Sequence, residues 1–222
     1  MSRLVEFDQE HSILNKLENA CLLEWVTKDY NTRCVKKHDL IRDMALKIMS
    51  CRCMVEASAQ LRDLPDKEKW KEGLEKVSLM NNNILEIRSG VSPRCQRLST
   101  LLLLGNGGLR RIPDSFFVLM CMLRVLDLSR TGIEVLPKSI VDSENLVALL
   151  LRWCSKLKCL PSLAKLCALR KLDLNGSGIE EVPEGMEMLI NLKYLNLKEE
   201  YLKSLPCGIL PRLRHLQCLI VW

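Results

Sequence analysis

The sequence predicts an α/β protein: a leucine-rich-repeat solenoid of about seven repeats, preceded by a small, mainly helical segment. Two observations predict the solenoid, namely a leucine pattern that recurs every 23 to 25 residues and a small polar side chain at a fixed place after it. A third, helical periodicity within the first fifty residues, predicts the leading segment. Self-similarity at such a period is the signature of stacked repeats.

Each repeat opens with a leucine, and apolar residues recur at positions 3 and 5, counted from that leucine. Residues two apart on a strand share one face, so both should point into a core. No single repeat can bury its own leucines, so the repeats are expected to stack. The opening residues are Leu74, Leu98, Leu123, Leu146, Leu169, Leu192 and Leu216.

Position 8 follows the strand, where the chain turns away and buried backbone groups need partners. Small polar side chains there can form a ladder of hydrogen bonds from repeat to repeat. Five repeats then reach an Ile-Pro, Leu-Pro or Val-Pro pair, and proline ends the turn because it has no N–H. The position 8 residues are Asn82, Asn106, Thr131, Cys154, Ser177 and Glu200.

Two of these ladder residues are unusual. Cys154 has two interpretations, a catalytic cysteine or a ladder residue whose thiol is a weak donor, and we favour the ladder. Glu200 would be costly as a buried charge. We therefore expect its turn to open toward solvent.

The first fifty residues follow a different pattern. Apolar residues at helical spacing predict helices over 11–24 and 38–49, and residues 25–36 between them predict a hairpin with a polar turn. Helix, hairpin and helix fit the end of a winged-helix domain. We therefore expect a partial winged-helix domain over residues 1–50, a linker over 51–73 and a leucine-rich-repeat domain over 74–222.

Residues 11–24 (HSILNKLENACLLE) and 35–45 (VKKHDLIRDMA), followed by repeats with a closing Leu-Pro, resemble plant disease-resistance proteins. These are intracellular immune receptors of the coiled-coil, NB-ARC, leucine-rich-repeat family. The family carries a Met-His-Asp motif in its winged helix, whose histidine approaches the ADP phosphate. His38 and Asp39 match its last two residues, and Lys37 stands where methionine is usual. The resemblance implies a vestigial nucleotide-binding site at His38 and Asp39.

Without the resemblance, His38 is a residue at a helix start and Asp39 is favoured by the positive end of that helix. No G-x-x-x-x-G-K-[ST] motif occurs in the sequence. We therefore expect no cofactor for this chain, and ADP or ATP only in a full-length receptor with a P-loop. The three histidines are not spaced for a metal site or a catalytic triad, so neither a metal nor an enzyme is expected.

Composition is that of an ordinary soluble protein, with 27% charged and 48% hydrophobic residues. The N-terminus lacks the apolar core of a signal peptide, and the longest apolar run, Phe116 to Leu123, has eight residues. We expect a cytoplasmic protein without an integral membrane segment; a peripheral position at the plasma membrane stays open. The net charge of +6 is a mild excess, compatible with an acidic partner or an anionic membrane surface.

The sequence favours a module for protein recognition and autoinhibition in a plant immune receptor. The resemblance implies three partners: a pathogen effector, a guarded host protein or the receptor's own NB-ARC domain. A generic intracellular repeat scaffold with an inert winged-helix remnant is the main alternative. Nucleic-acid binding through the winged helix is not expected, because Arg42 and Lys47 stand beside Asp39 and Asp43.

Positions 2, 4 and 6 flank the buried leucines and should form one concave sheet face. Its middle is apolar and its surroundings are polar, as in a partner-binding patch. The residues expected to bind a partner are Leu102, Leu104, Val125, Asp127, Leu150, Arg152, Lys171, Asp173 and Tyr194.

Overall fold

The structure is a computed structural model that describes residues 12, 15–17, 20, 23–28, 32–198, 202, 206 and 208–221. The chain forms two compact units, the N-terminal unit Met1–Ser50 and the solenoid Cys51–Trp222. Where the structure describes the chain, no helix is long and apolar enough to cross a membrane.

The N-terminal unit contains an antiparallel hairpin and a helix. Strands β1 (Leu23–Lys28) and β2 (Thr32–Lys37) pair from Leu23 opposite Lys37 to Lys28 opposite Thr32. Helix α2 (Asp39–Met49) follows directly. The hairpin and the helix predicted over 38–49 are thus confirmed, whereas the helix predicted over 11–24 lies mostly outside the described residues.

Local interactions explain where α2 begins and ends. His38 is the N-cap, and its Nδ1 accepts the Leu40 N–H at 3.4 Å. Asp39 lies in the positively polarised first turn, and at the other end Ser50 Oγ donates to the Lys47 carbonyl at 2.8 Å. The structure thus gives His38 the helix-start role that the sequence suggests without the resemblance.

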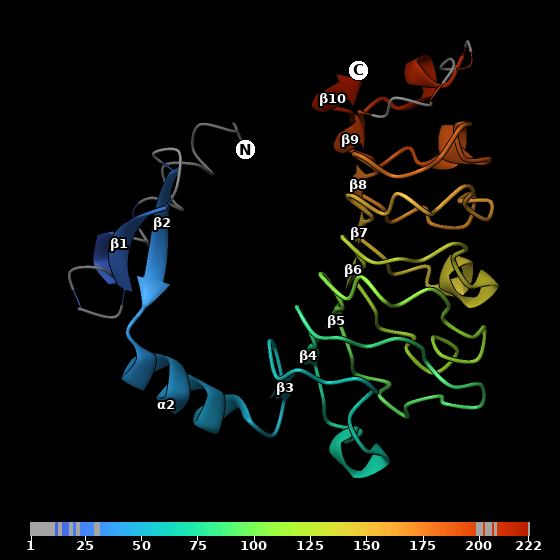
Figure 1. Ribbon diagram of the computed structural model, residues 1–222. Helices are drawn as coiled ribbons and strands as arrows, with labels where there is room; N and C mark the ends of the chain where they lie inside the picture. Colours follow the sequence, from blue (N-terminus) through green and yellow to red (C-terminus); the bar gives the residue numbers. More distant parts are fainter. Residues whose placement is uncertain are drawn as a thin grey trace. The chain divides into compact units, whose positions relative to one another are not determined.

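The solenoid is built on one parallel sheet of eight strands in sequence order, one strand for each turn of the chain (Figure 1). Neighbouring strands pair in register, so equivalent positions of successive repeats form straight rows. The strands are β3 (Cys53–Val55), β4 (Lys76–Ser78), β5 (Thr100–Leu102), β6 (Val125–Asp127), β7 (Ala148–Leu150), β8 (Lys171–Asp173), β9 (Tyr194–Leu197) and β10 (Cys218–Val221).

Strand β3 lies in residues 51–73, which we expected to be a linker. It pairs with β4, with Met54 opposite Val77, and Met54 is buried in the core. The leucine pattern misses this strand because Cys51 stands at the opening position and Glu56 at position 5. The segment therefore contributes a strand to the repeat sheet.

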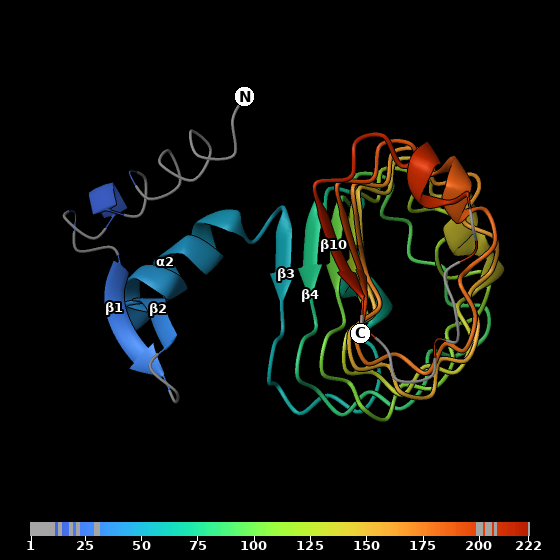
Figure 2. The same cartoon turned by 90° about the horizontal axis from the view of Figure 1, so that it is seen from above.

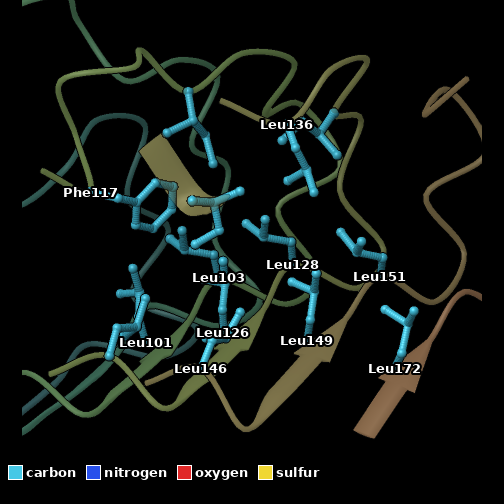
Figure 3. Close-up of a cluster of buried hydrophobic side chains, with 14 of the residues drawn as sticks. Leu101, Leu103, Phe117, Leu126, Leu128, Leu136, Leu146, Leu149, Leu151 and Leu172 are labelled. Atoms are coloured by element: carbon cyan, nitrogen blue, oxygen red, sulfur yellow. The ribbon is translucent and has the colours of Figure 1, made fainter. Parts of the chain in front are cut away.

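The core lies between the sheet and the arcs that return the chain to the next strand. Leucines at positions 0, 3 and 5 point into this space from successive strands (Figure 3), and Leu126 and Leu149 are fully buried. Burying such a side chain contributes about 1.5–3 kcal/mol. The leucine repeat is therefore the main stabilising feature of the solenoid.

In the later turns, short 3-10 helices lie in the arcs, across the core from the sheet (Figure 2). Phe116 packs edge-on against Trp70 and Phe117, at ring-centroid distances of 6.2 and 5.1 Å. These aromatic rings are buried in the core of the first turns of the stack. The 3-10 helices are η2 (Lys67–Lys69), η3 (Lys138–Asp142), η4 (Met186–Met188) and η5 (Leu210–Arg212).

The position 8 ladder forms as the spacing predicts in the first repeats. The Asn82 side-chain amide donates to the carbonyls of Glu56 and Leu79, and its Oδ1 accepts the Leu61 N–H. Asn106 likewise donates to Leu79 and Leu103. Each asparagine thus ties its own repeat to the preceding one.

The ladder weakens toward the C-terminus. Thr131 Oγ1 donates to the Leu128 carbonyl of its own repeat at 2.7 Å, and the Cys154 thiol donates to the same carbonyl at 3.1 Å and lies 3.6 Å from Thr131 Oγ1. Ser177 Oγ is buried without a hydrogen-bond partner among the described residues. Glu200 lies outside the described residues, so the opening of its turn stays a prediction.

Candidate protein-binding face

The face of the sheet that points away from the core carries positions 2, 4 and 6, and strand register groups the expected residues into rows. Val125, Ala148, Lys171 and Tyr194 form one row on β6 to β9, and Leu102, Asp127, Leu150 and Asp173 form a second on β5 to β8. Seven of these eight residues, all except Ala148, are ones that we expected to bind a partner, and the strand register makes them neighbours along one surface.

Four apolar side chains lie on this face, on or just after β5, β6 and β7, with Asp127 between Leu102 and Leu150 in the strand register. Leu102, Leu104, Val125 and Leu150 are half-buried, in contrast to the fully buried leucines on the other face of the same strands. Strand pleating explains the difference, because successive residues point to opposite sides. We call these four residues the apolar patch.

Position 4 has a structural role that the sequence prediction missed. Asp127 Oδ1 accepts the Ser129 N–H at 2.9 Å, Asp173 accepts that of Asn175 at 3.3 Å, and Asn196 that of Lys198 at 3.1 Å. Asp and Asn favour this bond to the backbone two residues on. The recurring Asp or Asn at position 4, at or next to the end of the strand, was the available signal.

Asp173 is almost fully buried, with 2% of its surface exposed. Its second oxygen lies 3.7 Å from Arg152 Nε, and the Arg152 side chain is half exposed. Asp173 therefore orients Arg152, and the guanidinium is the group that a partner can reach. On the neighbouring row, Lys171 Nζ lies 4.8 Å from the centre of the Tyr194 ring, a cation–π distance.

Position 7 has left-handed backbone geometry in every repeat where it is described, and we call this row the rim. The φ angle is +54° at Arg130 and +58° at Trp153, compared with +79° at Gly105 and +65° at Gly176. Left-handed φ strains residues other than glycine. Asn81 and the glycines were the sequence signal for this row, but Arg130 and Trp153 carry none.

Trp153 is 53% exposed. A Cβ placed on Gly176 would lie 2.5 Å from Trp153 Cε3, so the indole packs directly on the glycine backbone of the next repeat. Arg130 is its neighbour on the rim, since the Arg130 N–H donates to the Arg152 carbonyl at 2.7 Å. The rim thus adds an aromatic ring and a cation that the sequence prediction missed.

Cys154 is fully buried in the ladder, and burial raises its pKa above the ordinary value for a thiol. A nucleophilic cysteine needs accessibility and a lowered pKa. Both observations support the ladder interpretation. In the described part of the chain, no group of three or more His, Cys, Asp or Glu side chains could hold a metal ion.

His38 and Asp39 are exposed at the start of α2, and Arg42 lies 3.4 Å from Asp39. His38 already accepts a backbone hydrogen bond through Nδ1. A vestigial role of this pair in nucleotide binding stays a prediction.

Comparison with known sequences identifies the family of this chain. Disease resistance protein At4g27190 of Arabidopsis thaliana is 37% identical over 214 residues, which cover 93% of this chain and 21% of that protein. Disease resistance protein SUMM2 of the same plant is 40% identical over 159 residues, or 68% of this chain and 17% of that protein. This chain is a relative of plant disease resistance proteins. It spans about a fifth of their length, and no family model matches it.

Solved structures place the chain among leucine-rich-repeat folds. A Leptospira interrogans leucine-rich-repeat protein, LIC12759, superposes with a TM-score of 0.65 and 24% identity, covering 80% of this chain and 45% of that one. The leucine-rich-repeat domain of the type III effector XopL superposes with a TM-score of 0.51, also at 24% identity, covering 81% of this chain and 71% of that one. At these identities the likeness establishes the fold alone.

Proposed function

We propose that this relative of plant disease resistance proteins is a protein-recognition module of a cytoplasmic immune receptor, working by protein–protein contact and without catalysis. The observation that carries the proposal is the apolar patch, which lies on the outward sheet face among polar and charged side chains. An apolar patch surrounded by polar side chains is characteristic of a protein-binding surface.

The family resemblance supports a second part of the proposal, that the same face holds the receptor inactive by binding its own NB-ARC domain. In this proposal residues 1–50 are the end of the winged-helix part of that domain, and residues 74–222 are the recognition domain. A pathogen effector or a guarded host protein would compete for the patch. Binding of such a protein to the patch would displace the NB-ARC domain and so release the receptor from its inactive state.

The test uses the nucleotide-binding part of the Arabidopsis relative At4g27190, which is 37% identical over the matched segment. Its dissociation constant for this chain is measured by biolayer interferometry, for the original sequence and for Leu104→Asp and Leu150→Asp. A charge in the patch should weaken the contact at least about tenfold, roughly 1.4 kcal/mol. Circular dichroism should show folded repeats in both variants, because neither side chain enters the core.

Leu85→Asp is the matched control. Leu85 is 59% exposed and belongs to the arc that follows β4, so its variant should bind like the original chain. Unfolding of both patch variants, or unchanged binding by both, would refute the assignment of the face.

A further inference from the structure

From the distribution of charge along the stack we infer that the outward face of β6 to β9 takes an acidic, extended segment of a partner protein, with Trp153 as its apolar anchor. This inference rests on the proposed function and specifies the chemistry of the partner. Three independent observations carry it: segregation of charge, cations without ion-pair partners, and an exposed tryptophan on a strained backbone.

Charge is segregated between the sheet and the arcs. The strand segments 123–130, 146–153, 169–176 and 192–198 hold seven Lys or Arg against two Asp. The arcs between them, 131–145, 154–168 and 177–191, hold four Lys against seven Asp or Glu. In these repeats positive charge is therefore concentrated along the strands and at their ends, whereas the arcs 131–145 and 177–191 are acidic and the arc 154–168 is basic.

The cations stand at both ends of the strands. Arg124, Arg170 and Lys193 directly precede β6, β8 and β9, whereas Arg130, Arg152 and Lys198 follow β6, β7 and β9. Each of the six is exposed. An extended segment lying along the stack would thus have a guanidinium or ammonium group on either side.

Within the described residues, only one of these six cations forms an ion pair. Arg152 pairs with Asp173 at 3.7 Å, and the other five cations at the strand ends have no carboxylate within 4.0 Å in that part of the chain. Both Asp residues of the face bind backbone N–H groups. The face therefore attracts anions, and one oxygen of each of its two carboxylates is already bound to the backbone.

Trp153 indicates where the segment is anchored. Its left-handed φ of +58° is strained for any residue with a side chain, yet half of its surface is exposed, so burial does not offset the strain. The described position 7 residues share this left-handed φ, so what distinguishes Trp153 among them is its large, half-exposed aromatic side chain. Tryptophan and arginine are among the side chains that dominate binding energy at protein interfaces; Arg152 precedes Trp153 in the chain, and Arg130 is its neighbour in the position 7 row.

Fluorescence anisotropy with a labelled peptide of alternating Glu and Phe tests the inference on the full chain. We expect saturable binding that weakens as NaCl is raised, because exposed charges are screened by salt. The same peptide with Gln in place of Glu should bind at least about tenfold more weakly. Equal affinity for the two peptides would overturn the inference.

Trp153→Gly separates binding from folding. Glycine relieves the left-handed strain, so the melting temperature should stay the same or rise, while affinity for the Glu–Phe peptide falls about tenfold, as for a hot-spot residue. Arg130→Gly should behave in the same way. Asn81→Gly is the matched control, since Asn81 shares the left-handed geometry (φ +53°) but lacks an aromatic ring or a charge, and it should bind normally.

Competition experiments identify the occupant. Phosphatidylserine vesicles, oligo(dT) or a second copy of this chain that displaced the peptide at lower concentration than unlabelled peptide would each overturn the assignment to an acidic protein segment. If At4g27190 binding depends on Leu104 and Leu150 but the acidic peptide does not bind, only this inference fails. The proposed function would then stand without it.

Discussion

Leu126 illustrates what a single residue contributes to the solenoid. It is fully buried at position 3 of β6 and lies opposite Leu101 and Leu149 on the neighbouring strands. Leu126→Ala should lower the free energy of unfolding by about 2–5 kcal/mol, from lost burial and the cavity left behind. Urea unfolding followed by circular dichroism measures this.

Leu85→Ala is the comparison for that experiment. Because 59% of Leu85 is exposed, its truncation should change stability by no more than about 0.5 kcal/mol. An unchanged midpoint for Leu126→Ala would mean that the register is wrong.

Cys95 couples stability to alkaline pH. It is buried, and burial raises its pKa to about 11 from an ordinary value of 9.0. The folded state therefore holds the thiol proton more tightly than the unfolded state. Below pH 9 the thiol is protonated in both states, so stability is unaffected, and from pH 9 to about 11 stability should fall because only the unfolded state ionises readily.

Urea titrations of the original chain and of Cys95→Ala, between pH 8 and 10.5, measure this effect. The variant should be less stable at pH 8, and the difference between the two proteins should shrink above pH 9. A difference that stays constant across this range would contradict a raised pKa.

At the scale of one element, Asn106 and Ser177 occupy the same position of the ladder, but only the Asn106 side chain bonds to the preceding repeat in the described residues. Asn106 donates to two backbone carbonyls and accepts the Ile84 N–H, all in buried surroundings. Asn106→Ala leaves these groups unpaired and should cost about 1–3 kcal/mol. Ser177→Ala should change stability by less than about 0.5 kcal/mol, since Ser177 Oγ has no partner in the described residues.

Thermal denaturation of both variants provides the measurement. The same melting temperature for Asn106→Ala and the original chain would show that the ladder contributes nothing. A large loss for Ser177→Ala would instead reveal a partner for this hydroxyl.

An element could be predicted where the spacing of its own apolar residues determines its structure. Strands β4 to β10 were predictable because their leucines repeat at fixed spacing, and α2 because its apolar residues recur at helical spacing. Strand β3 was not predictable, because it carries none of the repeating leucines and joins the sheet through backbone pairing with β4. At the site, alternation distinguishes the half-buried Leu102 and Leu150 from the fully buried leucines beside them. It could not give the burial of Asp173 or the strained φ of Trp153, which depend on the neighbouring repeats.

Across the whole solenoid, the ladder implies a gradient of local stability. Asparagines tie the first repeats together through their amides, whereas Cys154 contributes only the weaker contacts of a thiol, with Leu128 and Thr131, and Ser177 Oγ has no partner in the described part. In a stack where each repeat contacts only its neighbours, opening depends on these interface terms. Amides in residues 79–84 and 103–109 should therefore exchange with deuterium more slowly than those in 174–179.

Hydrogen exchange followed by mass spectrometry measures this gradient. Asn106→Ala is an internal check, because it should raise exchange in residues 79–84 and leave 174–179 unchanged. Uniform exchange along the stack would show that the leucine core alone determines local stability.

The left-handed row at position 7 has a consequence for how such a protein can change over generations. Ser58, Asn81, Arg130 and Trp153 all occupy this geometry, so the backbone there is imposed by the fold and not by the residue. A substitution at this position alters the outer edge of the sheet without disturbing the leucine register beneath it. The repeats that carry a side chain at this position therefore offer a site where new surface chemistry can arise while the scaffold stays the same, whereas Gly176 has no room for one beneath the Trp153 indole.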